Sequence, residues 1–335
     1  MLKFMAVLPV CLLACWPVLP SSAQTVDVHL APRVAQLNRA DATSEVGGTA
    51  DSERLSHAKP IRKDVDLVLV PVTITDPMNR LVAGLEKDSF VLKEDDQLQR
   101  IRSFSTEDAP ISLGVIFDLS GSMADKIDKS RQAVLEFFRT ANPDDDFFLV
   151  AFSDTPEVLV DFTSSVDDIQ NRLEYANPRG CTALLDAIYL GINRMRNARH
   201  ERKALLIISD GGDNRSRYTE NEIKDMVSEA DIQIYAMAIV DRQRKTPEEL
   251  HGPELLSAIT GATGGQTYFI HSPRDLAPVA TKIGIELRNQ YLLGYHPTNP
   301  AHDGKWRKIK VKVNPPKGLP QLHVYAKAGY YTAAE

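Results

Sequence analysis

The chain has 335 residues, a length that fits two domains more comfortably than one. Charged residues make up 25% and apolar residues 43%, which is typical of an ordinary globular protein. The formal net charge of −6 provides no basic surface, so nucleic acid is excluded as an expected partner. The 8 histidines occur without metal-ligand spacing and no C-x-x-C pair exists, so zinc chemistry has no support.

The first 23 residues have the pattern of a signal peptide. Residues 4–16 form an apolar stretch too short for a comfortable membrane span, and residues 21–23 supply small side chains for cleavage after Ala23. An alternative is cleavage at residues 12–15, which resemble a bacterial lipoprotein box and would anchor the protein through Cys15. Both alternatives predict export, to the periplasm or outside the cell, with no transmembrane helix in the mature chain.

Residues 24–64 show no sustained hydrophobic period, and we predict a flexible linker there. Residues 65–108 are expected to form β structure. In their first strand, at residues 67–74, Pro71 favours a position at a sheet edge or a bulge, because proline cannot donate to a strand ladder. Asp95-Asp96 is predicted to be an exposed hairpin turn, since the spacing of a calcium-binding EF-hand is absent.

The tail, residues 289–335, returns to β structure. Ile309, Val311 and Val313 alternate with lysines, the pattern of a half-buried strand. Neither this tail nor residues 65–108 is long enough for a convincing core alone. We therefore predict that the two segments form one smaller β-sandwich-like domain into which residues 109–288 are inserted.

Residues 109–288 alternate between strand and helix patterns, which predicts an α/β fold with a doubly wound, mostly parallel sheet. The connection at residues 154–156 is too short for a parallel crossover, so it predicts an antiparallel hairpin. The expected strands are 113–117, 146–153, 157–162, 203–209, 232–240 and 267–270, and the expected helices are 124–140, 166–176, 183–197, 220–230, 253–260 and 275–287.

Oxygen-bearing side chains follow the strands of this region. Asp118, Ser120 and Ser122 come directly after the first buried strand, Thr182 starts a predicted helix, and Asp210 ends another apolar strand. The carboxyl ends of strands are where open α/β sheets bind ligands. Carboxylates and hydroxyls are hard donors that suit Mg²⁺ and suit zinc poorly. Helix capping by Asp118 and Ser120 is the alternative, but it does not account for the two later positions.

These residues resemble the metal-ion-dependent adhesion site of the von Willebrand factor A (VWFA) domain. That site has a D-x-S-x-S motif, a threonine in a G-x-T-A-L type segment and an aspartate in an S-D-G type turn. Asp118, Ser120, Ser122, Thr182 and Asp210 match it residue by residue. The segment before the threonine departs at one position, a cysteine where many members have glycine. The layout of nearly the whole mature chain also resembles a group of exported bacterial VWFA-related proteins.

The resemblance implies a Mg²⁺ site, with Mn²⁺ or Ca²⁺ as alternative ions. In the family pattern Ser120 and Ser122 bind the ion directly, Thr182 binds directly or through water, and Asp118 and Asp210 act largely through water. We also expect Asp118 to face solvent at the end of its strand, so that Asp118→Ala would leave the fold intact.

The resemblance further implies an adhesion-type function, in which an Asp or Glu of a protein ligand completes the coordination of the ion. Met123, Arg179 and Asp213 lie in the loops that we expect to contact this partner. Two other classes of function stay open: a structural scaffold with a non-essential metal site, and a metal-dependent enzyme. We expect no enzyme, because the phosphate-binding and nucleophile motifs are absent and the glycines of residues 261–265 are typical of a helix end.

Overall fold

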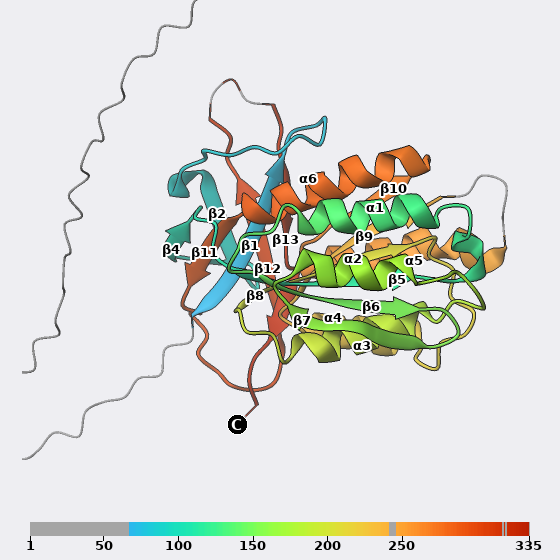
Figure 1. Cartoon of the computed structure of the whole chain (residues 1–335). Coiled ribbons are helices and arrows are strands. Elements are labelled where there is room, and N and C mark those ends of the chain that lie inside the picture. The colour runs from blue at the N-terminus through green and yellow to red at the C-terminus, as the bar shows by residue number, and fades with distance from the viewer. Residues whose placement is uncertain (1–66, 241–245, 317, 319, 335) are drawn as a thin grey trace, which may run out of the picture. The chain divides into compact units, whose positions relative to one another are not determined.

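The computed structural model describes residues 67–240, 246–316, 318 and 320–334 (Figure 1). The predicted signal peptide and linker, residues 1–23 and 24–64, lie outside the described residues. No helix within the described ranges is both long and apolar enough to cross a membrane.

Among the described residues, six strands form one sheet in the order β10-β9-β8-β5-β6-β7. All neighbours are parallel except β6 and β7, which form the predicted antiparallel hairpin. Every residue of the central strand β5 is buried, as expected of a parallel strand covered on both faces. The strands are β5 (Ile111–Asp118), β6 (Asp146–Phe152), β7 (Pro156–Thr163), β8 (Arg202–Ser209), β9 (Gln233–Ile239) and β10 (Thr267–Ile270).

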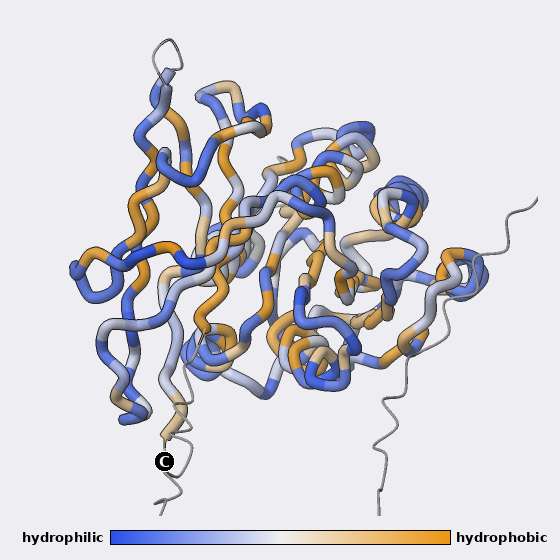
Figure 2. Tube along the Cα trace, turned by 90° about the vertical axis from the view of Figure 1, so that its left-hand side faces the viewer, coloured by the Kyte–Doolittle hydropathy of each residue, from blue (hydrophilic) through white to orange (hydrophobic). Residues whose placement is uncertain are grey.

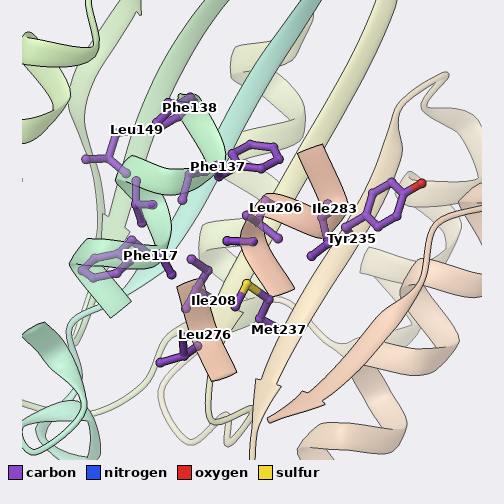
Figure 3. Packing of buried hydrophobic residues seen from close by; sticks show 14 of the residues in the cluster. Phe117, Phe137, Phe138, Leu149, Leu206, Ile208, Tyr235, Met237, Leu276 and Ile283 are labelled. Carbon is purple, nitrogen blue, oxygen red and sulfur yellow. The ribbon is translucent and has the colours of Figure 1, made fainter. Parts of the chain in front are cut away.

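Helices cover both faces of this sheet. Figure 3 shows Phe137 and Ile283, from the helices of one face, directed at Leu206 and Met237 of the strands. On this face lie α1 (Ile127–Phe138), α2 (Val166–Glu174) and α6 (Leu276–Arg288). On the other face lie α3 (Leu184–Met195), α4 (Glu220–Glu229) and α5 (Pro247–Thr263). The structure therefore confirms the doubly wound α/β architecture. Figure 2 shows hydrophobic residues gathered along the strands and the inner sides of the helices.

The α5 helix begins six residues earlier than predicted, at Pro247, and contains Pro253 in its interior. The prediction placed Pro253 at the first helical position, where a missing backbone N–H has no cost. In the structure the preceding turns supply their own hydrogen bonds, such as that from Leu250 N to Thr246 O at 3.1 Å. A helix can continue through a proline when its neighbouring turns and its packing compensate for one lost bond.

Two antiparallel sheets complete the part of the chain that the structure describes, in the orders β13-β1-β11-β4 and β14-β12-β2-β3. Strands from before and after the α/β region pair with each other in both sheets: β1 pairs with β11 and β13, and β12 pairs with β2. The strands are β1 (Val68–Thr75), β2 (Phe90–Glu94), β3 (Gln97–Gln99), β4 (Ile101–Ser105), β11 (Tyr291–Tyr295), β12 (Trp306–Val313), β13 (His323–Ala326) and β14 (Gly329–Tyr331). Short 3-10 helices occur at η1 (Lys87–Ser89), η2 (Gly121–Met123) and η3 (Pro273–Asp275).

The two antiparallel sheets share one hydrophobic core, to which both ends of the described chain contribute. Val70 and Leu92 come from the first segment, and Leu293 and Ile309 come from the second. The core needs residues of both segments, which explains why the two segments pack together as one β-sandwich-like unit. The residue boundaries of the predicted domains stay a prediction.

Strand β1 corrects one expectation. Pro71 does not lie on an edge strand, because β1 is placed between β11 and β13. It faces Leu292 of β11 in a regular register, without a bulge. The pairing with β13 starts only at Val72, so no ladder partner faces Pro71 on that side of the strand. The missing N–H is tolerated because the neighbouring strand ends there.

Candidate metal centre

The five predicted site residues lie at one edge of the parallel sheet, the edge toward which the arrow of β6 points in Figure 1. Asp118 is the last residue of β5, and Asp210 follows the parallel strand β8 directly. Ser120 lies just before η2, Ser122 lies within it, and Thr182 precedes α3. The polarity of neighbouring parallel strands is what brings the two aspartates, 92 positions apart in the printed sequence, to the same edge.

Backbone hydrogen bonds join the loop after β5 to the loop before α3. Arg179 N donates to Leu119 O at 2.7 Å, and Gly121 N donates to Gly180 O at 3.1 Å. The two loops therefore hold each other in place. This contact positions Thr182 relative to the two serines although about 60 residues separate them in the sequence.

Asp118 and the serines form a compact group of oxygen atoms. Asp118 Oδ1 accepts a hydrogen bond from Ser120 N at 2.8 Å, and Asp118 Oδ2 accepts one from Ser209 Oγ at 2.6 Å. The hydroxyl oxygens of Ser120 and Ser122 are 3.0 Å apart. Asp118 is 0% exposed, so the expectation that it faces solvent was wrong. The strand end is covered because the loop after β5 and the end of β8 close over it.

The loop after Asp210 supports Thr182 and the start of α3. Thr182 N donates to Asn214 Oδ1 at 2.9 Å, and Asn214 N donates to Thr182 O at 3.1 Å. Asp213 Oδ2 accepts hydrogen bonds from Leu185 N and from the hydroxyl of Ser216. Asp213 thus ties its own loop to the first turn of α3, which is a local task separate from any partner contact.

The other two residues predicted to contact a partner have different surroundings. Arg179 is exposed, as a contact residue should be. Met123 is fully buried in the core below α1, so its side chain is out of reach of a partner in this structure. The position inside η2 explains this, because the short helix turns one side chain inward.

A family model of the von Willebrand factor type A domain matches residues 114–212, a range that contains all five site residues. The chain carries a von Willebrand factor type A domain. It shares 16% sequence identity with BatB from Bacteroides thetaiotaomicron, over 52% of this chain and 98% of that chain, with a TM-score of 0.42.

Two other solved structures are similar to the chain. A von Willebrand factor type A protein from Catenulispora acidiphila is 13% identical, over 79% of this chain and 74% of that chain, with a TM-score of 0.46. The vWF domain of the type V pili tip protein Mfa5 from Porphyromonas gingivalis is 12% identical, over 53% of this chain and 95% of that chain, with a TM-score of 0.42. No curated protein matches the sequence.

The electrostatics of the A-domain site are dominated by its two aspartates. Burial raises the pKa of Asp118 to about 7, and repulsion from Asp210 adds to the rise, while the hydrogen bonds from Ser120 and Ser209 oppose it. Lys126 lies beside them, with its Nζ 3.6 Å from Asp210 Oδ2 and donating to Ser122 O at 3.0 Å. Two buried carboxylates beside one ammonium leave a net negative charge at this edge.

The donor set fits a hard divalent cation. Its side chains offer carboxylate and hydroxyl oxygens, which are the ligands that Mg²⁺ prefers, and no sulfur or imidazole nitrogen. The 3.0 Å separation of the Ser120 and Ser122 hydroxyls allows both to face one ion. The net negative charge and the mutual repulsion of Asp118 and Asp210 both favour a cation there.

Sequence reasoning missed several residues of the site. Ser209 directly precedes Asp210 and Asn214 follows it by four positions, and their polar side chains near the motif were the available signal. Lys126 lay within the loop segment that the motif begins, but its charge next to Asp210 depends on how η2 and α1 are placed. Gly252, on α5, contacts Gly211 and had no sequence signal linking it to the site.

Asp118→Asn should raise the free energy of unfolding of the protein in EDTA at pH 8. The same replacement of a solvent-facing aspartate would leave it nearly unchanged. A raised pKa means that the folded state disfavours the ionised carboxylate, so the charge costs stability once the pH exceeds the unfolded value. Asparagine keeps the shape and removes the charge. We expect a gain on the order of 2 kcal/mol in the free energy of unfolding.

Urea unfolding as a function of pH checks this prediction. The difference between Asp118→Asn and the wild type should grow between about pH 4 and pH 7 and disappear below about pH 4, where the wild-type carboxyl is protonated in both states. A variant that is less stable than the wild type at pH 8 in EDTA would show that the hydrogen bonds to the carboxylate outweigh its burial.

Proposed function

We propose that the protein is a metal-dependent protein-binding module that engages an Asp or Glu of a partner protein through a Mg²⁺-type ion. The observation that carries the proposal is the convergence of two buried carboxylates and three hydroxyl side chains, Asp118, Asp210, Ser120, Ser122 and Thr182, at the carboxyl edge of the sheet of an A domain. A bound ion would supply an open coordination position for an acidic side chain.

The residues of the chain would divide the work. Ser120, Ser122 and Thr182 would hold the ion, and their hydroxyls add no negative charge, so the ion stays electron-poor. Asp118 and Asp210 would hold it largely through water, while the hydrogen bonds that Asp118 accepts from Ser120 and Ser209 keep the loop after β5 and the end of β8 in place. Arg179, exposed on the neighbouring loop, would attract a partner carboxylate.

Two weaker alternatives remain. A scaffold that does not need the ion would retain the same buried site, and only measurements of binding separate it from the proposed function. An enzyme has less support, because the sequence contains no phosphate-binding glycine loop and no nucleophile elbow. Export through the signal-like residues 1–23 is part of the proposal, and it would place the site where extracellular or periplasmic partners are available.

Calorimetric titration of the protein with Mg²⁺ tests the metal site. We expect one binding event for the wild type, and its loss in Asp210→Asn, because this change removes a negative charge beside the ion. Asp128→Asn is the matched control: its side chain is 88% exposed on α1 and should leave the titration unchanged. Equal heats for all three proteins would contradict the proposed site.

Affinity capture in Mg²⁺ and in EDTA tests the partner. A partner protein should be retained by the wild type and Asp128→Asn in Mg²⁺, released by EDTA, and not retained by Asp210→Asn. Retention that is the same in EDTA would favour the scaffold alternative.

A further inference from the structure

Lys126 is a buried lysine at the metal centre. Its residue is 5% exposed, in the turn between η2 and α1, although lysine is almost never fully buried unless it is paired. Its Nζ lies 3.6 Å from Asp210 Oδ2, and both side chains are 6% exposed. The same Nζ donates to Ser122 O at 3.0 Å, so the ammonium lies against two of the proposed ion-binding residues.

The surroundings of this ammonium explain how a buried lysine is stabilised here. Asp118 is 0% exposed and Asp210 is 6% exposed, and the two carboxylates repel each other. Without a nearby cation, burying both would be strongly unfavourable. An ammonium at this position compensates part of their charge, as a bound divalent ion would also do.

We infer that Lys126 is a built-in counter-cation of the Asp118–Asp210 pair, which stabilises the site when no divalent ion is bound and opposes the binding of such an ion. The second half of the inference rests on the proposed function. Lys126 therefore sets how tightly the site holds its ion.

The charges give this inference a consequence for partner binding. Asp118, Asp210 and Lys126 together have a formal net charge of −1. A divalent ion would change the net charge to +1, and a partner carboxylate would return it to zero. The lysine thus makes the ion-bound site more attractive to an acidic ligand while it weakens the hold on the ion alone.

Thermal unfolding of the full chain in EDTA tests the counter-cation role without any metal. Lys126→Gln retains a hydrogen-bond donor for Ser122 O and removes the charge, and we expect its Tm to fall by about 6 °C. In an Asp210→Asn background the same change should lower the Tm by less than half as much, because the charge that Lys126 compensates is gone. A Lys126→Gln variant that folds only in the Asp210→Asn background would give the same answer.

Two further variants separate charge from packing. Lys126→Arg keeps the positive charge and should behave like the wild type within about 2 °C. Lys129→Gln is the matched control and should have no effect, because Lys129 is exposed on α1 and donates a hydrogen bond to Gln132 on the surface. An unchanged Tm for Lys126→Gln in EDTA, or an equal loss in both backgrounds, would overturn the inference.

Calorimetric titration with Mg²⁺ tests the opposition to the ion. We expect Lys126→Gln to bind Mg²⁺ about tenfold more tightly than the wild type, and Lys129→Gln to bind with wild-type affinity. Equal or weaker binding by Lys126→Gln would overturn this half of the inference. If none of the proteins binds Mg²⁺, the proposed function fails, whereas the measurements in EDTA still decide whether Lys126 is the counter-cation of the aspartates.

Discussion

Arg288→Met should lower the free energy of unfolding by about 3–5 kcal/mol, because it removes the ion-pair partner of a buried carboxylate. Arg288, at the end of α6, forms an ion pair with Asp145, which is 0% exposed. Asp145 also accepts hydrogen bonds from Ile111 N at 2.9 Å and from Asn142 N at 2.7 Å. Asp145 therefore connects the first residue of β5 with the last residue of α6.

This connection lies where the chain enters and leaves the A domain. A second arginine acts at the same place: Arg202 donates to Ala109 O at 2.8 Å and to Leu287 O at 2.6 Å. Arg202 and Arg288 therefore hold the segment that enters the A domain next to the segment that leaves it. Removing Arg288 should loosen the A domain and its junction with the antiparallel sheets at the same time.

Urea denaturation of Arg288→Met and Arg139→Met checks this prediction. Arg139 is the matched control, since its side chain is 61% exposed and it pairs with Glu136 on the surface of α1. Such a pair is worth at most about 1 kcal/mol. The double variant Asp145→Asn/Arg288→Met should recover part of the lost stability, because it no longer buries an unpaired charge. Similar losses for the two single variants would show that the buried pair has no special role.

Gly252→Ala should weaken Mg²⁺ binding about 10–100-fold without changing any of the proposed ion ligands. Gly252, on α5, packs against Gly211, the residue after Asp210, and a Cβ atom at position 252 would lie 2.1 Å from Gly211 O. The clash is with backbone, so the loop with Asp210 must move. Gly211 has a φ of +82°, a left-handed conformation that limits how the loop can adjust. We also expect a loss of about 1–3 kcal/mol in stability from overpacking.

The control for this prediction lies in the same helix. A Cβ at Gly261 would have nothing within 4 Å, so Gly261→Ala should keep the Mg²⁺ affinity and should stabilise the helix by about 0.5–1 kcal/mol. Mg²⁺ titration and urea unfolding of the two variants provide the comparison. Wild-type Mg²⁺ affinity in Gly252→Ala would mean that the loop after β8 does not position the site.

Gly252 and Lys126 both affect the metal centre, but they do so through different interactions. Gly252 acts through the shape of the loop after β8, and Lys126 acts through charge beside Asp210. Gly252→Ala should therefore weaken the binding of Mg²⁺, whereas Lys126→Gln should tighten it. Opposite changes in Mg²⁺ affinity would separate positioning from electrostatics.

The sequence by itself was sufficient to predict the strands and helices of the A domain and to identify the family that the site resembles. Continuous apolar stretches of strand length and helical periodicity are local properties, so strands such as β10 and helices such as α2 were predicted close to their observed bounds. Asp118 ends β5 and is followed within four residues by Ser120 and Ser122, and Asp210 directly follows the parallel strand β8. Parallel strands bring their carboxyl ends to one edge, so the sequence pattern implied that these residues share that edge. The pairing of β5 with β8, which makes them close neighbours, is a property of the tertiary structure.

Only the tertiary structure decided what surrounds these residues, because burial depends on segments that are distant in the chain. Asp118 is buried because Ser209 and the loops close over it, and Met123 faces the core because η2 turns it inward. Pro71 is tolerated inside a sheet because β13 ends beside it, so no strand on that side requires its missing N–H. Lys126 became part of the site only when η2 and the start of α1 placed its ammonium next to Asp210, a charge contact that no local pattern encodes.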